Sequence, residues 1–65
     1  MAEDTIEQQI AEPRRKEMFR VMVESQDRGM PVAESRRYIV QQFGVTESQV
    51  RLVEREGMDS NWPPL

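Results

Sequence analysis

Residues 39–53 read IVQQFGVTESQVRLV, and this stretch decides the fold. Apolar residues recur at helical spacing on both sides of Gly44, with Ile39 before it and Val50 and Val53 after it. Two helices that meet at a steep angle need facing apolar sides and, between them, a residue that tolerates positive φ. The stretch therefore predicts a helix-turn-helix, a unit whose second helix commonly lies in the major groove of DNA.

Proline and glycine divide the rest of the chain into helical segments. Pro13 and Pro31 suit the first turn of a helix, because the N–H that proline lacks would have no partner there. Gly29 suits the left-handed conformation that closes a helix, and Thr46 suits an N-cap. We expect three helices, over residues of about 13–27, 31–43 and 46–56, with Gly57 closing the last one.

Sixty-five residues suffice for one domain whose core buries only about 60% of the surface of the unfolded chain. We expect an all-α fold, a small three-helix bundle over residues 13–57 that contains the helix-turn-helix. Residues 1–12 form an acidic leader that we expect to be disordered, since its composition is rich in charge.

The C-terminal tail, residues 58–65, carries the only tryptophan of the chain, directly before two prolines. Trp62 either packs on the core, where an indole adds a large apolar area, or docks into a partner together with Leu65. In the second reading Pro63 and Pro64 reduce the entropy lost on binding.

The composition excludes several classes of function. The chain has no cysteine and no histidine, which removes disulfides, thiolate or imidazole metal sites and every pairing of a nucleophile with histidine. We therefore expect a protein that is not an enzyme and that needs no cofactor. No apolar run is long enough for a membrane span, so we expect no membrane association and a cytoplasmic location.

The formal net charge of −3 is unevenly distributed. Residues 1–12 hold four acidic and no basic side chains, whereas residues 13–65 hold nine basic and eight acidic ones. The near-neutral body neither requires nor forbids DNA. Two basic groups, Arg14, Arg15 and Lys16 on the first helix and Arg36 and Arg37 on the second, either hold phosphates or serve as solubility charges drawn to the acidic leader.

The outer face of the third helix is the main candidate site. Ser48, Arg51, Leu52 and Arg55 project together, away from Val50 and Val53. The arginines suit guanine edges or phosphates, Ser48 or Gln49 suits hydrogen bonds to a base or the backbone, and Leu52 suits a thymine methyl. Alternatively, the arginines merely solvate the helix and pair with its glutamates.

Residues 43–57, FGVTESQVRLVEREG, resemble the C-terminal, promoter-reading helix-turn-helix of bacterial RNA polymerase sigma factors, whose usual wording is close to FGVTRERVRQIEREA. The resemblance implies that Glu47, Ser48, Gln49, Arg51 and Leu52 occupy the surface that reads the promoter. The chain departs from the family where its usual arginine, glutamate and arginine are replaced by glutamate, serine and glutamine at positions 47–49. A leucine also stands at position 52, where glutamine is common.

Two functions follow as expectations. The first is a transcription-associated DNA-binding module with the helix of residues 46–56 as its recognition helix, acting as a homodimer because one short helix gives limited affinity. The second is a module of the same fold that binds a protein, such as the transcription machinery, through Leu52, Trp62, Leu65 and the acidic leader. Salt-sensitive binding of duplex DNA separates the two.

Overall fold

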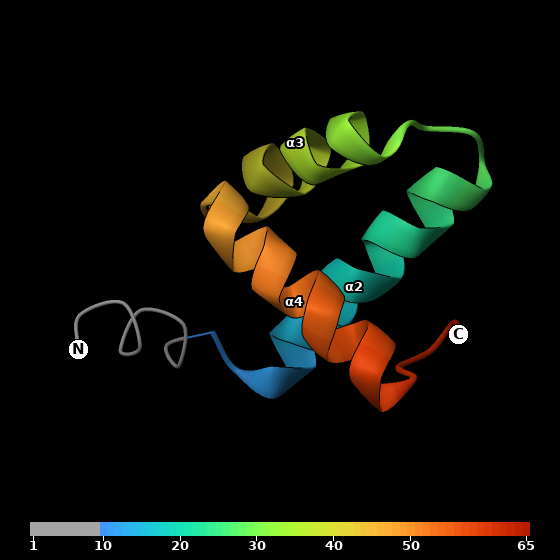
Figure 1. Cartoon of the computed structure of the whole chain (residues 1–65). Coiled ribbons are helices and arrows are strands. Elements are labelled where there is room, and N and C mark those ends of the chain that lie inside the picture. The colour runs from blue at the N-terminus through green and yellow to red at the C-terminus, as the bar shows by residue number, and fades with distance from the viewer. Residues whose placement is uncertain (1–9) are drawn as a thin grey trace.

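The computed structural model describes residues 10–65 and places three helices in them, α2 (Glu12–Asp27), α3 (Val32–Phe43) and α4 (Glu47–Ser60) (Figure 1). None of the described residues lies in a strand. Each pair of helices is in contact, so the three close around a common core. The prediction of a small all-α three-helix bundle is confirmed.

The boundary of the predicted leader differs from the observed one. Glu12 is already the first residue of α2, and Ile10 packs, partly buried, against the core. Proline is tolerated in the first turn of α2, because the first N–H groups of a helix have no intrahelical acceptor. Residues 1–9, and with them the prediction of disorder, lie outside the described residues.

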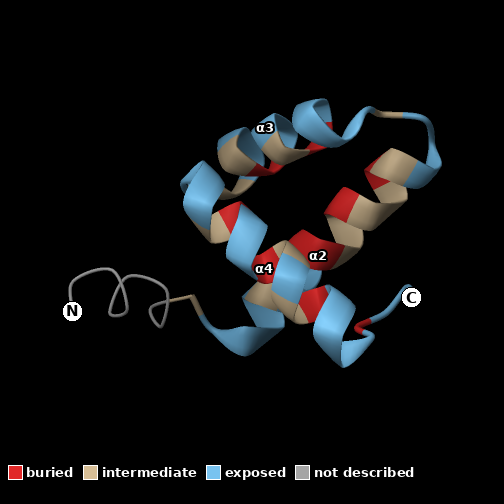
Figure 2. Cartoon of the chain, in the orientation of Figure 1, coloured by how far each residue is buried: buried red, intermediate tan, exposed pale blue. Residues whose placement is uncertain are grey.

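The core consists of side chains from all three helices and from the tail. Figure 2 shows buried positions on the sides of the helices that face one another. The buried apolar residues are Met18, Phe19, Met22, Ile39, Val50, Val53 and Trp62. Ile39, Val50 and Val53, which the sequence pattern placed on the facing sides of the two helices around Gly44, are among them.

The turn between α3 and α4 follows the predicted chemistry. Gly44 has φ 67° and ψ 40°, the left-handed conformation, and its N–H donates to the carbonyl of Val40 at 3.0 Å. A residue with a side chain is strained at this φ, whereas glycine is not. Thr46 then caps α4, so only three residues separate the two helices.

The prediction that Gly57 closes the last helix is wrong. Helix α4 continues through Gly57 to Ser60, and Asn61, with φ 53°, is its left-handed C-cap. Gly57 is buried against the ring of Phe19, and a Cβ at this position would lie 2.6 Å from Cγ of Phe19 and closer still to Cδ1 and Cε1. This glycine permits the close approach of α2 and α4 and does not end a helix.

Trp62 lies in the core, with 7% of its surface exposed. Its ring meets that of Phe19 edge to face, with centroids 6.0 Å apart. The backbone N–H of Trp62 donates to the carbonyl of Gly57 at 2.9 Å. The indole closes the end of the bundle between α2 and α4. Leu65 remains on the surface, 58% exposed.

Candidate nucleic-acid interface

Helix α4 presents one face to the core and another to solvent. Val50, Val53 and Gly57 are buried, whereas Ser48, Arg51, Leu52 and Arg55 are exposed. The division follows from the 100° turn per residue, which places the second set on the opposite side of the helix. The structure brings these four predicted residues together on one surface.

Gln49 is half-buried at the edge of that surface, and it lines the same groove as Leu52 and Arg55. Its side-chain oxygen accepts a hydrogen bond from the N–H of Thr46 at 2.9 Å, and its own N–H donates to the hydroxyl of Thr46 at 3.2 Å. These reciprocal bonds form a capping box, which satisfies two backbone donors at the start of α4. A base contact through the side-chain oxygen of Gln49 would compete with this cap.

The glutamates of α4 are paired with arginines. Glu47 accepts from Arg51 one turn further along the same helix, with 3.2 Å between Oε2 and Nη2. Glu54 accepts from Arg36 of α3 at 3.0 Å, where both side chains are largely sheltered. The predicted phosphate contact of Arg36 therefore competes with an ion pair that joins the two helices.

A third glutamate ties α4 to α2. Arg15 donates to both carboxylate oxygens of Glu56, at 2.9 and 3.0 Å, and to the carbonyl of Ile10 at 2.6 Å. The hydrogen bond with Glu56 is the main reason that the pKa of Arg15 is raised. A bidentate ion pair of this kind fixes the relative orientation of the two side chains as well as adding electrostatic attraction.

Arg55 and Arg37 differ from these residues. Both are exposed, and neither forms an ion pair within the described part of the chain. Arg37 lies on α3, and Arg55 lies near the middle of the outer face of α4. Of the predicted DNA contacts, these two cations are the ones that a phosphate or base would meet without first displacing a carboxylate.

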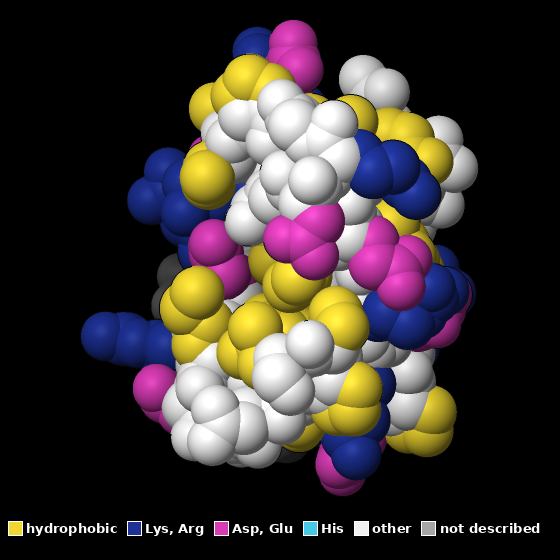
Figure 3. Space-filling model, turned by 90° about the vertical axis from the view of Figure 1, so that its right-hand side faces the viewer, with side chains coloured by type: hydrophobic (Ala, Val, Ile, Leu, Met, Phe, Trp, Pro, Cys, Tyr) yellow, Lys and Arg dark blue, Asp and Glu magenta, His cyan; other side chains and the backbone are white. Residues whose placement is uncertain are grey.

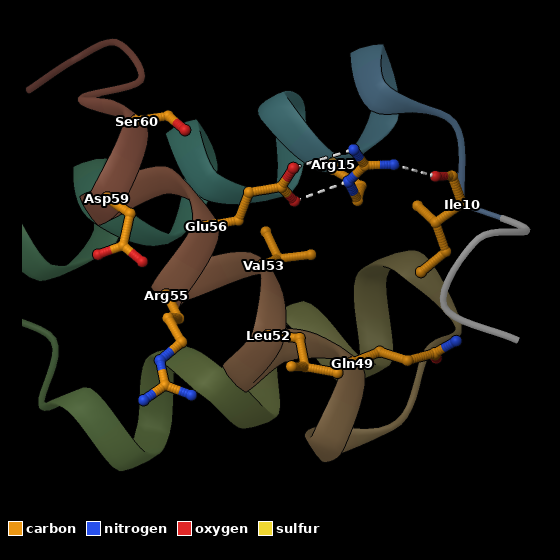
Figure 4. A pocket seen from close by; sticks show the side chains of 9 residues that line it. All are labelled: Ile10, Arg15, Gln49, Leu52, Val53, Arg55, Glu56, Asp59 and Ser60. Carbon is orange, nitrogen blue, oxygen red and sulfur yellow. Dashed lines mark hydrogen bonds and ion pairs between the residues drawn. The ribbon is translucent and has the colours of Figure 1, made fainter. Parts of the chain in front are cut away.

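A groove of about 540 Å³ runs along one flank of α4. Figure 4 shows Ile10, Leu52 and Val53 as its apolar part, with the Arg15–Glu56 pair at one side. A second hollow, of about 430 Å³, opens toward Arg36. Leu52, Arg55 and Asp59 line both hollows and so separate them on the surface of α4. Asp59 is a surface acceptor that the sequence pattern did not single out.

The residues predicted to bind a protein partner do not share one surface position. Leu52 is 40% exposed beside the groove, and Leu65 is exposed at the end of the tail, but Trp62 is enclosed by the core. Docking through Trp62 would require its ring to leave Phe19. Leu52 and Leu65 are the members of the predicted set that a partner can reach.

Charges are mixed on the side of the molecule that Figure 3 shows. The face that carries the α2–α3 connection and the C-terminal tail has hydrophobic side chains near its middle, with basic and acidic side chains interspersed around them (Figure 3). This view agrees with the near-neutral composition of residues 13–65. Any preference of the molecule for an anionic partner must therefore come from local placement of cations rather than from a broad field.

Sequence reasoning missed the ion pairs that join different helices. The pair of Glu47 and Arg51 has a recognisable spacing of four residues. The partners in Arg36–Glu54 and Arg15–Glu56 lie 18 and 41 residues apart, and no local pattern relates them. Their pairing depends on how the helices cross.

Comparisons with protein-family models, with curated proteins and with solved structures found no match to this chain. The resemblance to the sigma-factor helix-turn-helix thus rests on residues 43–57 and stays a prediction. Within residues 10–65, no helix is long and apolar enough to cross a membrane. The same residues contain no cluster of three or more acidic side chains arranged to hold a metal ion.

Proposed function

We propose that the protein is a small cytoplasmic DNA-binding protein associated with transcription, with α4 as its recognition helix. One observation carries the proposal: Ser48, Arg51, Leu52 and Arg55 form a single exposed face on α4, which follows α3 after a turn of three residues. A helix of this kind fits the major groove, where side chains on its outer face meet base edges.

Each of these side chains has a suitable chemistry. Arg55 has five N–H donors and no ion-pair partner within residues 10–65, so it suits O6 and N7 of guanine or a phosphate. Leu52 offers an apolar surface for a thymine methyl, and Ser48 offers a hydroxyl. Arg51 must give up its ion pair with Glu47 to contact DNA, which reduces its net contribution to the affinity for DNA.

Arg37 adds a further cation on α3 for a backbone phosphate, while Arg36 is held by Glu54. Two short recognition helices bind more strongly than one, so we further propose a homodimer on DNA. Sedimentation with and without duplex tests this part separately.

The experiment is a titration of duplex DNA with the full chain, followed by fluorescence anisotropy at about 50 mM and about 200 mM salt. We expect binding that weakens with salt, and weaker binding after Arg55→Ala. Arg28→Ala is the matched control, since Arg28 is an exposed arginine in the α2–α3 connection without an ion pair in the described region. Equal losses for the two variants would contradict a specific role of α4.

A protein-binding module is the second candidate, because the face of α4 also has apolar features. Leu52 and Met58 are exposed, and the groove beside Leu52 has apolar side chains from Ile10 and Val53. An absence of DNA binding even at about 50 mM salt would favour this function over the first.

A further inference from the structure

Three cations follow one another at the start of α2, and each has a different partner in the structure. Arg15 is bound by Glu56, and Lys16 is paired with Glu12 at 3.2 Å. Arg14 instead reaches across to the end of α3, 29 residues away along the chain. The basic cluster seen in the sequence therefore consists of two cations that are paired with carboxylates and one, Arg14, that is not.

Two contacts hold the guanidinium of Arg14 in place. Its Nη2 donates to the carbonyl oxygen of Phe43 at 2.9 Å, and its Cζ lies 5.1 Å from the centroid of the Phe43 ring. Phe43 is the last residue of α3, and residues 44–46 lead directly into α4. The contacts thus fix a positive charge beside the turn of the helix-turn-helix.

This cation is free to receive an anion. Arg14 is exposed, and no carboxylate within residues 10–65 pairs with it. The bond to Phe43 uses one of the five N–H donors of the guanidinium, so the others remain for a ligand. Because its position is already set, little side-chain entropy remains to be lost on binding.

We propose that Arg14 binds one backbone phosphate of duplex DNA next to the start of α4. The inference rests on the proposed DNA-binding function and adds a positioning residue to it, supplied by the first helix of the bundle. The planar fork of a guanidinium matches phosphate oxygens. Phosphate contacts of this kind set the orientation of a recognition helix without reading sequence.

Arg14 also satisfies a carbonyl at the C-terminal end of α3, where a cation is favourable to the helix dipole. That role acts on folding stability, whereas a phosphate contact acts on the salt dependence of DNA binding. The two roles therefore have different readouts.

The test compares Arg14→Gln with the wild-type chain, using one random duplex between about 50 mM and about 200 mM salt. Each lost phosphate contact lowers the slope of log affinity against log salt by about 0.9. The ratio of wild-type to variant affinity should then be about 3.5-fold larger at the lower salt than at the higher. Arg28→Gln, the same charge change at the far end of α2, should leave the slope unchanged, and thermal unfolding of each variant reports on stability.

A lowered slope for Arg14→Gln alone supports the inference. If the wild-type chain binds DNA and Arg14→Gln shows the same salt slope, the inference is overturned and the proposed function stands. The same holds if Arg14→Gln differs from the wild-type chain only in thermal stability. An equal drop for Arg28→Gln overturns it as well, since general charge would then explain the effect. Absence of wild-type binding at about 50 mM salt refutes the proposed function and, with it, this inference.

Discussion

Gly57→Ala is expected to destabilise the protein, although alanine is the better helix former. In an exposed helix interior the change from glycine to alanine stabilises by about 1 kcal/mol. At position 57 the added methyl carbon would lie 2.6 Å from Cγ of Phe19 and closer to two other ring carbons, inside ordinary van der Waals contact.

The ring of Phe19 has little space into which it can move. Phe19 is fully buried, and Trp62 meets it edge to face with centroids 6.0 Å apart. Overpacking of a core costs about 1–3 kcal/mol, and this close approach belongs near the upper value. After the gain in helix propensity, we expect a net loss of about 2 kcal/mol in the free energy of unfolding.

For a domain of this size, such a loss corresponds to a fall in Tm of roughly 8–16 °C. Thermal and urea unfolding followed by far-ultraviolet circular dichroism measures both quantities. Ser60→Ala, an exposed substitution in the last turn of α4, is the control and should change stability by no more than about 0.5 kcal/mol.

A double-mutant cycle identifies the cause. In a Phe19→Leu background the ring is gone, so Gly57→Ala should cost at least about 1 kcal/mol less than it does in the wild-type chain. A Gly57→Ala protein with a raised Tm would refute the reasoning, since alanine would then behave at this site as it does in an exposed helix.

Three further changes test other parts of the molecule. Ser25 is buried, and its hydroxyl has no hydrogen-bond partner within residues 10–65. Ser25→Ala should therefore raise the free energy of unfolding, measured by urea titration, by up to about 1 kcal/mol. A lower free energy of unfolding would mean that the hydroxyl has a partner. Thr46→Ala removes the N-cap of α4 and should cost about 1 kcal/mol in thermal unfolding, whereas Thr46→Ser keeps the acceptor and should be nearly neutral. Glu47→Gln removes a carboxylate that would face phosphates and releases Arg51, so it should strengthen DNA binding at low salt, and unchanged anisotropy titrations would speak against α4 as the DNA-facing helix.

Much of the fold could be predicted because its signals are local. Gly44 provides the left-handed turn, Thr46 provides the cap, and the apolar period of the helices identifies the residues that face inward. The exposed face of α4 follows from the same period. The last turn of α4 could not be found in this way, since Gly57 has the sequence signature of a helix end.

The amino-acid sequence by itself determined the three helices, the turn and the set of side chains that α4 exposes, because these depend on residues within about one helical turn of one another. Only the tertiary structure decided that Gly57 packs under Phe19, that Trp62 closes the core, and that Arg15 and Arg36 are paired while Arg14 is not. These contacts join residues far apart along the chain. Their geometry is set by the way α2, α3 and α4 cross, and no local spacing encodes it.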